Sequence, residues 1–303
     1  VAGPQDIPSA FGFSEFSLKL NECFGNRRLR GPLLHLHADH VNFWRRHFAT
    51  GLPIMEQAFS ACLEVGDLMH AGMQANETLW HRVENGDALD DVLAAATPFA
   101  AFAKQSHNDA IHASIRVQQR FIGILVSDSP GSLAFDETFA QDTLPHAAEM
   151  ASFDIGMAFR GIMQLILAVL AGRRAAAVEI AEKARPLLAP VMAMPMEATY
   201  HFFHALALAA HYPDATQPQQ EKYLRLLEEK RTKLQLWARH CPENFENRAA
   251  LVSAEIARLQ GRELEAERSY EQAIRSAASN GFVHHQALAY ETAARFHAAR
   301  GFE

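Results

Sequence analysis

Small residues and glycines recur in this sequence at the spacing that two antiparallel helices need in order to approach each other closely. The clearest copy lies near the end of the chain and consists of Ala254, Ala257, Gly261, Ala266, Tyr270, Ala273 and Ile274. Small side chains let the two helix backbones come together, a glycine allows the tight turn between them, and an aromatic ring fills the gap against the next pair. The pattern predicts helix pairs that stack side by side, and it limits the fold more than any other feature.

The same pattern occurs at two further places. A second copy consists of Leu165, Ala168, Gly172, Ala177, Ala181 and Ala184, and a weaker copy follows Gly86. Gly86 and Gly172 lie 86 positions apart, and Gly172 and Gly261 lie 89 positions apart. Two helix pairs in each interval give a repeat slightly longer than the roughly 34 residues of tetratricopeptide (TPR) repeats. The residues that we expect to pack the repeats are Gly86, Gly172, Ala177, Ala254, Gly261, Ala266, Tyr270 and Ala273.

The rest of the sequence also favours helices. No stretch alternates apolar and polar residues as a half-buried strand does, whereas apolar residues at helical spacing recur between Gly, Pro, Asn and Asp breakers. We predict an all-α fold of about fourteen helices that forms an α-α superhelix, a TPR-like solenoid of antiparallel helix pairs. Its expected parts are N-terminal helical repeats in residues 1–126, a long loop in 127–146 and C-terminal TPR-like repeats in 147–303. We expect one continuous solenoid that is a fragment of a larger protein.

Composition excludes several classes of partner. The 303-residue chain is 49% apolar and 21% charged, and its formal net charge of −7 comes without a long basic run, so we expect no nucleic-acid partner. The longest apolar stretch, residues 161–172, is much shorter than the roughly 20 residues of a membrane span, so it predicts a buried helix. Three widely spaced cysteines form no disulfide or zinc pattern, which indicates reduced thiols and a cytoplasmic location.

The run His35-Leu-His37-Ala-Asp39-His40 has the spacing of the metal ligands in metallo-β-lactamase-like hydrolases. Those enzymes place the run after a strand, and this sequence predicts none. We expect instead a helix that starts at Gly31-Pro32 and forms one face from Leu34, Ala38, Val41 and Phe48. On such a helix His35 and His37 point in different directions. A metal site at His35, His37 and His40 is therefore only a weak candidate.

Glu197, His201 and His204 form a second weak metal candidate, because they share one face of a predicted helix. No second Glu-x-x-His supplies the matching ligands of a dinuclear helical site, so structural hydrogen bonding is the favoured interpretation. The sequence also contains no phosphate-binding loop of the G-x-x-x-x-G-K-[ST] type and no G-x-S-x-G nucleophile turn. We predict no catalytic residue and no cofactor, and the segment is expected not to be an enzyme.

Several stretches together resemble the helical region of large bacterial trifunctional kinases, which combine a serine/threonine kinase, a STAND-type ATPase and a sensor (hybrid) histidine kinase. The resemblance is carried by residues 51–72, 108–119, 198–210, 241–245 and 270–303, of which the last stretch is the most specific. The run of His35 and His37 departs from the single histidine of that family's pattern, so no shared role is transferred to these residues.

The resemblance implies a non-catalytic scaffold that relays signals between the ATPase and histidine-kinase modules of a two-component signalling protein. The expected partners are other domains of the same polypeptide or a separate protein. The alternative is a sensor segment that binds a small effector in the superhelix groove. A remote alternative is a metal-dependent hydrolase that uses His35, His37 and His40.

Overall fold

The computed structural model describes residues 6–127 and 135–301, and in these ranges it contains α-helices and short 3-10 helices but no strand. The predicted all-α helical repeat superhelix is confirmed, with fifteen α-helices in the described ranges where about fourteen were expected. The first six are α1 (Ile7–Phe24), α2 (Arg27–His40), α3 (Leu52–Glu64), α4 (Leu68–Asn85), α5 (Leu89–Gln105) and α6 (Asp109–Val126). The next six are α7 (Phe135–Asp142), α8 (Leu144–Glu149), α9 (Asp154–Leu170), α10 (Arg174–Ala184), α11 (Pro195–His211) and α12 (Gln217–His240). The last three are α13 (Pro242–Leu259), α14 (Glu263–Ser279) and α15 (Val283–Ala299).

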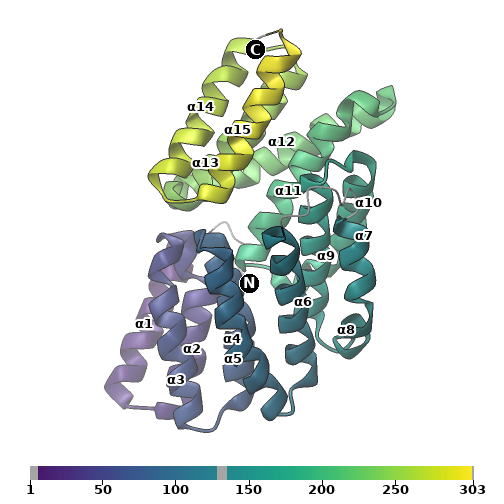
Figure 1. The fold of residues 1–303 in the computed structure, drawn as a ribbon. Coiled ribbons are helices and arrows are strands. Elements are labelled where there is room, and N and C mark those ends of the chain that lie inside the picture. Colours follow the sequence, from purple (N-terminus) through teal and green to yellow (C-terminus); the bar gives the residue numbers. More distant parts are fainter. Residues whose placement is uncertain (1–5, 128–134, 302–303) are drawn as a thin grey trace.

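Successive helices run antiparallel and stack into a curved array (Figure 1). Helices α1 to α6 stand side by side, α9 to α11 continue the row, and α13 to α15 form a separate block that lies across the end of the first helices (Figure 1). Within the described part of the chain, five short 3-10 helices occupy connections: η1 (Asn42–Trp44), η2 (Phe48–Thr50), η3 (Arg185–Leu187), η4 (Ala189–Val191) and η5 (Tyr212–Asp214). No helix in the described ranges combines the length and the apolar character that crossing a membrane requires.

The residues expected to pack the repeats lie at equivalent places. Gly86, Gly172 and Gly261 follow the ends of α4, α9 and α13 with φ of +81°, +68° and +70°, a left-handed conformation that glycine adopts without strain. Ala177, Ala254, Ala266, Tyr270 and Ala273 are all buried. The Tyr270 ring packs on Phe296 of α15 at a centroid distance of 5.3 Å, so it fills the space against the following helix.

The helix around the histidine run differs from the prediction, which was wrong about both of its ends. Helix α2 begins four residues before Gly31, because the Asn26 side chain caps it by accepting from the backbone N–H groups of Arg28 and Leu29 at 3.1 and 3.3 Å. Pro32 therefore lies inside the helix. Because proline has no backbone N–H, the carbonyl group four residues earlier, near the start of the helix, lacks its usual helical hydrogen bond. The helix ends at His40, and Phe48 belongs to η2.

The stretch expected to be a long loop, 127–146, contains helical structure. Residues 128–134 lie outside the described part, but α7 and the first residues of α8 fall within the stretch. Phe139 of α7 is buried and packs edge-on against Phe121 of α6 at 6.4 Å between ring centroids. An apolar anchor of this kind stabilises a short helix that Pro, Gly and Ser neighbours conceal in the sequence. The division of the chain into halves at this stretch stays a prediction.

Candidate functional site

The connection between α2 and α3, residues 42–50, reaches across the molecule to the C-terminal helices. The backbone N–H of Phe48 donates to Oδ1 of Asn244 at 3.1 Å, and Nδ2 of Asn244 donates to the carbonyl oxygens of Phe43 and Arg46 at 2.7 and 2.9 Å. A further bond joins Nε2 of His47 and the carbonyl oxygen of Asn280 at 3.0 Å. We use the name joint for the contact in which residues 42–50 and α4 pack against α11 to α15.

Buried aromatic rings fill the joint. Trp44 lies 5.0 Å from Trp237 and 5.3 Å from Phe245 between ring centroids, and it stacks on Phe245. The indole N–H of Trp44 donates to the carbonyl oxygens of His40 and Ala193. All three rings are buried, so the joint is a packed interior rather than a wet surface contact. Each such ring pair contributes about 0.5–1.5 kcal/mol beyond the area it buries.

An ion pair crosses the joint without access to water. Arg248 of α13 and Glu84 of α4 are 1% and 2% exposed, and Nη2 of Arg248 donates to the Glu84 carboxylate. The Thr199 hydroxyl on α11 donates to the same carboxylate and accepts from Nη1 of Arg248 at 3.2 Å. Trp80 completes the shell by donating to Glu84 at 2.8 Å. Glu84 thus has three hydrogen-bond partners and Arg248 has two, although Nε of Arg248 has none among the described residues, and the arrangement ties three helices together.

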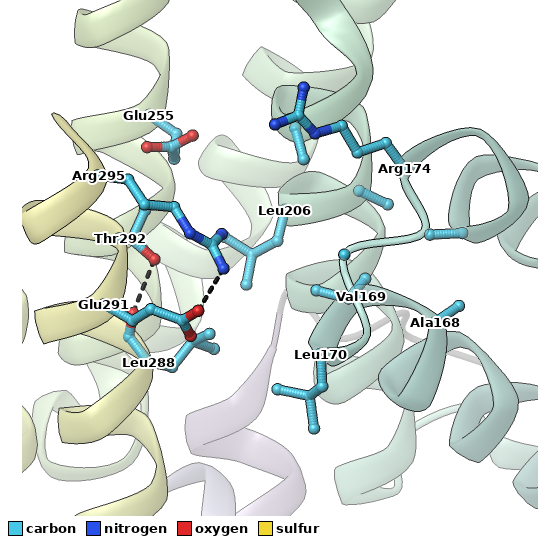
Figure 2. A pocket seen from close by; sticks show the side chains of 14 residues that line it. Ala168, Val169, Leu170, Arg174, Leu206, Glu255, Leu288, Glu291, Thr292 and Arg295 are labelled. Atoms are coloured by element: carbon cyan, nitrogen blue, oxygen red, sulfur yellow. Dashed lines mark hydrogen bonds and ion pairs between the residues drawn. The ribbon is translucent and has the colours of Figure 1, made fainter. Parts of the chain in front are cut away.

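A groove opens beside the joint, between α9 to α11 and α15. Its volume is about 240 Å³. Leu170, Leu206 and Leu288 supply apolar surface, and Figure 2 shows the side chains of Arg174, Glu255 and Arg295 around the opening. Arg295 is paired with Glu291 on its own helix. The groove thus combines apolar surface with charged groups of both signs, of which Glu255 is buried and already accepts from Arg258 and Tyr270.

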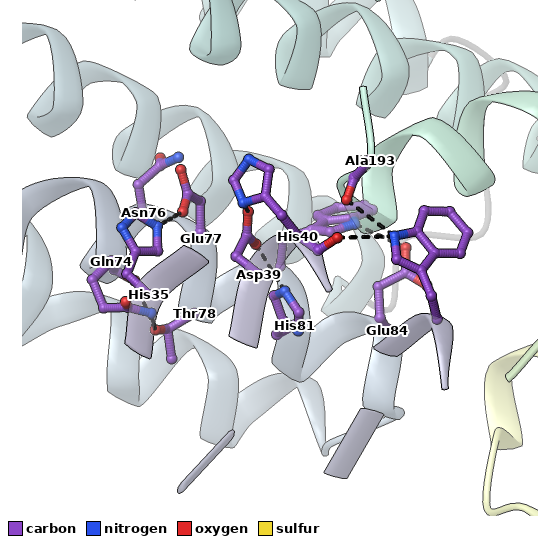
Figure 3. A network of polar contacts seen from close by, with 12 residues as sticks. His35, Asp39, His40, Gln74, Asn76, Glu77, Thr78, His81, Glu84 and Ala193 are labelled. Atoms are coloured by element: carbon purple, nitrogen blue, oxygen red, sulfur yellow. Dashed lines mark hydrogen bonds and ion pairs between the residues drawn. The ribbon is translucent and has the colours of Figure 1, made fainter. Parts of the chain in front are cut away.

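A second polar cluster lies between α2 and α4 (Figure 3). His35 and the Glu77 carboxylate share a hydrogen bond, and Nε2 of His81 lies 2.8 Å from Oδ1 of Asp39. These four residues are all buried. The fifth member, His40, is partly exposed, and its Nδ1 lies 3.1 Å from Oδ2 of Asp39.

The charges of this cluster depend on one another. Burial alone would lower the pKa of His35, but the adjacent Glu77 carboxylate raises it to about 9. Burial and the nearby Asp39 carboxylate raise the pKa of Glu77. The pKa of Asp39 is held below its ordinary value against the effect of burial, because the imidazoles of His40 and His81 face it. Without a bound ion, the cluster therefore keeps His35 cationic to balance the buried carboxylates.

The cluster follows the repeat of the helices. The contacts His35–Glu77 and Asp39–His81 each join residues 42 positions apart, and Gln118 reaches Asn76 over the same separation at 2.9 Å. Polar contacts of the same sequence separation thus join α2 to α4 and α4 to α6, and the separation lies close to the repeat length inferred from the turn glycines.

The structure divides the residues of the histidine run between two faces of α2. His35, Asp39 and His40 turn toward α4, whereas His37 faces α1. Nδ1 of His37 lies 2.9 Å from the Ser14 hydroxyl, and its ring packs against Phe11 at 5.6 Å. His37 is therefore separated from His35 and His40, and the hydrolase ligand arrangement does not form.

The other weak candidate surrounds a lysine. Nζ of Lys233 donates to Glu197 at 3.1 Å and to Nε2 of His201 at 3.0 Å, and the other Glu197 oxygen accepts from the backbone N–H of Ala193 at 2.9 Å. Burial, reinforced by Lys233, lowers the pKa of His201 to about 2, and burial with Lys230 lowers that of His204 to about 3. Both imidazoles are neutral at physiological pH, and the lysine ammonium occupies the position facing the carboxylate and imidazole.

Sequence reasoning did not identify the joint or the partners Glu77 and His81. Glu84 and Arg248 lie 164 positions apart, and nothing in the local pattern of either helix pairs them. The partners of the cluster could have been found from the sequence, because the pattern His-x-x-x-Asp on α2 is followed one repeat later by the complementary pattern Glu-x-x-x-His on α4.

Comparison with known proteins agrees with the repeat architecture. A family described as CHK1-like, TPR repeats matches residues 161–298, a little less than half of the chain. Hybrid signal transduction histidine kinase G of Dictyostelium discoideum is 22% identical over 118 residues, which are 39% of this chain and 3% of that protein. The chain therefore spans only a small part of this relative. The matches identify a TPR-like helical region that is similar to a segment of a signalling kinase.

Proposed function

We propose that this chain is a scaffold that binds another domain of its own polypeptide and transmits movement between two ends of the superhelix. The family match to TPR repeats and the similarity to a segment of a hybrid histidine kinase support this class of function. The modules that the scaffold would connect are an ATPase of the STAND type and a sensor histidine kinase, in a cytoplasmic bacterial protein that also carries a serine/threonine kinase.

The observation that carries the proposal is an exposed apolar stripe on α1, at the first turn of the superhelix. Its members Phe13, Phe16, Leu20 and Phe24 are 75%, 62%, 44% and 78% exposed. They share one face of the helix, opposite the buried Phe11. Contiguous apolar surface of this kind marks a contact with another protein surface, since leaving three phenylalanines in water forgoes about 1.5–3 kcal/mol for each. An apolar helix face of a neighbouring domain fits the stripe.

In this proposal, movement passes between the N-terminal helices and α13 to α15 through the joint. It fixes the block of α13 to α15 on the N-terminal helices through the Glu84–Arg248 pair and the aromatic rings around Trp44. Because a packed interior has few alternative arrangements, a displacement of α1 to α4 is passed on to α13 rather than absorbed.

The stripe is tested by hydrogen exchange and crosslinking in the parent polypeptide. We expect α1 to exchange more slowly and to crosslink to another domain there, and Phe16→Glu with Phe24→Glu to abolish both effects. Leu264→Glu is the matched control, because Leu264 on α14 is 59% exposed and lies outside the stripe. Equal exchange of α1 in the parent polypeptide and in the isolated chain would exclude the proposal.

A small effector in the groove is the second candidate, because Arg174, Glu255 and Arg295 gather around an apolar floor. The volume of about 240 Å³ lies below the roughly 300–1,000 Å³ of ligand pockets, which favours the scaffold. A thermal-shift screen of metabolites distinguishes the two, since an effector in the groove raises the melting temperature by mass action and Leu206→Trp would remove the shift.

A further inference from the structure

The buried cluster between α2 and α4 has the composition of a metal site. His35 and Asp39 lie one helical turn apart on α2, and Glu77 faces them from α4. One ligand atom from each of these three residues lies within 4.8 Å of the others. All three are more than nine-tenths buried. Two rigid helices thus present three ligands to one point, the way in which helical proteins build metal sites.

His40 stands beside these three residues but outside the set whose ligand atoms lie within 4.8 Å of one another. Its Nδ1 faces Oδ2 of Asp39 as an ion pair at 3.1 Å, and neither atom has a further hydrogen-bond partner among the described residues. His40 therefore adjoins the ligand Asp39 and is placed to position its carboxylate.

A supporting shell is also present. Nε2 of His81 lies 2.8 Å from Oδ1 of Asp39, the oxygen that does not face His40. A hydrogen bond from His81 at this position fixes the carboxylate, while its other oxygen, which faces His40, still has a lone pair for an ion; this is the role of outer partners in metal sites. His40 is 29% exposed at its side chain, so it marks the side from which an ion reaches the cluster.

We propose that His35, Asp39 and Glu77 bind one divalent transition-metal ion of the zinc class, which fastens α2 to α4, and that His40 positions the Asp39 carboxylate. The mixed imidazole and carboxylate set suits Zn²⁺ and Co²⁺ and disfavours Ca²⁺ and Mg²⁺, which take oxygen ligands. A divalent cation would take over from the protonated His35 in offsetting the charge of the two buried carboxylates, and the His35 imidazole would release its proton to solvent on binding. This inference is independent of the proposed scaffold function, since it concerns only these two helices.

The test is a titration of the chelator-stripped 303-residue chain with Co²⁺ and Zn²⁺, followed by cobalt absorption and calorimetry. We expect one ion per chain, a tetrahedral cobalt spectrum, displacement of cobalt by zinc and a higher melting temperature. The variant His40→Asn should weaken affinity about 10- to 100-fold, a loss of the size seen for altered metal-site partners. Since His40 is partly exposed, this variant keeps the core intact and remains folded.

His37→Gln is the matched control, because His37 belongs to the same run but faces α1. It should bind cobalt with the affinity of the unaltered chain, whereas Glu77→Gln should lose binding while circular dichroism shows retained helix. No stoichiometric binding at millimolar cobalt, an octahedral spectrum, or equal affinity in His40→Asn and His37→Gln would overturn the proposal.

Discussion

Replacing Arg248 by Met should be among the most damaging single changes in the chain. The side chain is 1% exposed, and its guanidinium is the cation that faces the 2% exposed Glu84 carboxylate across the joint. Methionine keeps much of the volume but leaves a buried carboxylate without its counter-charge. Removal of one partner of a buried pair costs about 3–5 kcal/mol. The guanidinium also lies 5.8 and 5.9 Å from the ring centres of Phe202 and Phe245, contacts that the variant loses.

The double variant Glu84→Gln with Arg248→Met separates charge from packing. In the double variant the amide oxygen at position 84 still accepts hydrogen bonds from Trp80 and Thr199, and no buried charge remains. The double variant should therefore be less destabilised than Arg248→Met alone. Urea unfolding monitored by circular dichroism gives the free energy of unfolding of each variant and hence the coupling energy.

The matched control is Arg262→Met, which breaks the exposed pair Arg262–Glu265, 41% and 48% exposed at the side chains. This change should cost at most about 1 kcal/mol. A cost for Arg248→Met as small as that of Arg262→Met, or a coupling energy near zero, would refute the assignment of a dry ion pair to the joint.

Three further predictions concern the turn glycines, the buried histidines and the thiols. Gly86→Ala should lower the free energy of unfolding more than Gly172→Ala. Both positions have positive φ, but only at Gly86 would the new Cβ meet a backbone atom, the carbonyl oxygen of Gly281 at 3.1 Å. Equal losses of unfolding free energy in urea would contradict this. The pKa of His201 and His204 is lowered to about 2 and 3, chiefly by burial, so the unfolded chain binds protons that the folded chain does not. The stability that these histidines contribute should therefore be complete above about pH 6.5 and fall on acidification from there toward about pH 4, by up to about 1.4 kcal/mol per pH unit for each group, and His204→Gln should make this fall less steep. Burial raises the pKa of Cys62 to about 11 and that of Cys241 to about 12, while Cys23 is exposed, so a thiol reagent should modify one cysteine in the folded chain and three in urea.

The sequence sufficed for the helical repeat fold, because that fold is specified by local and regularly spaced residues. Turn glycines such as Gly86 and small residues such as Ala254 define helix ends and close contacts within a few positions. The predicted helix boundaries were wrong where a local sequence signal was misleading. Pro32, for example, was expected at the start of a helix, but it lies inside α2 because Asn26 caps the helix earlier.

The candidate sites were less accessible, since they depend on separations much longer than a helix pair. His35 and Asp39 were visible as part of the histidine run, but their partners on α4 follow 42 positions later. The joint brings residue 48 to residue 244, a contact that depends on the curvature accumulated over all intervening helices. Small changes in repeat geometry alter that curvature without a recognisable change in pattern.

The amide proton of Phe48 offers the most direct measurement of the joint. It lies in a short irregular connection, and its acceptor is the side chain of Asn244, 196 positions away. Hydrogen exchange measured by NMR should find this amide protected like those of the neighbouring helices in the unaltered chain, and unprotected in Asn244→Ala. Exchange of the Phe48 amide at the rate of a free loop in the unaltered chain would show that the two ends of the superhelix do not meet as described.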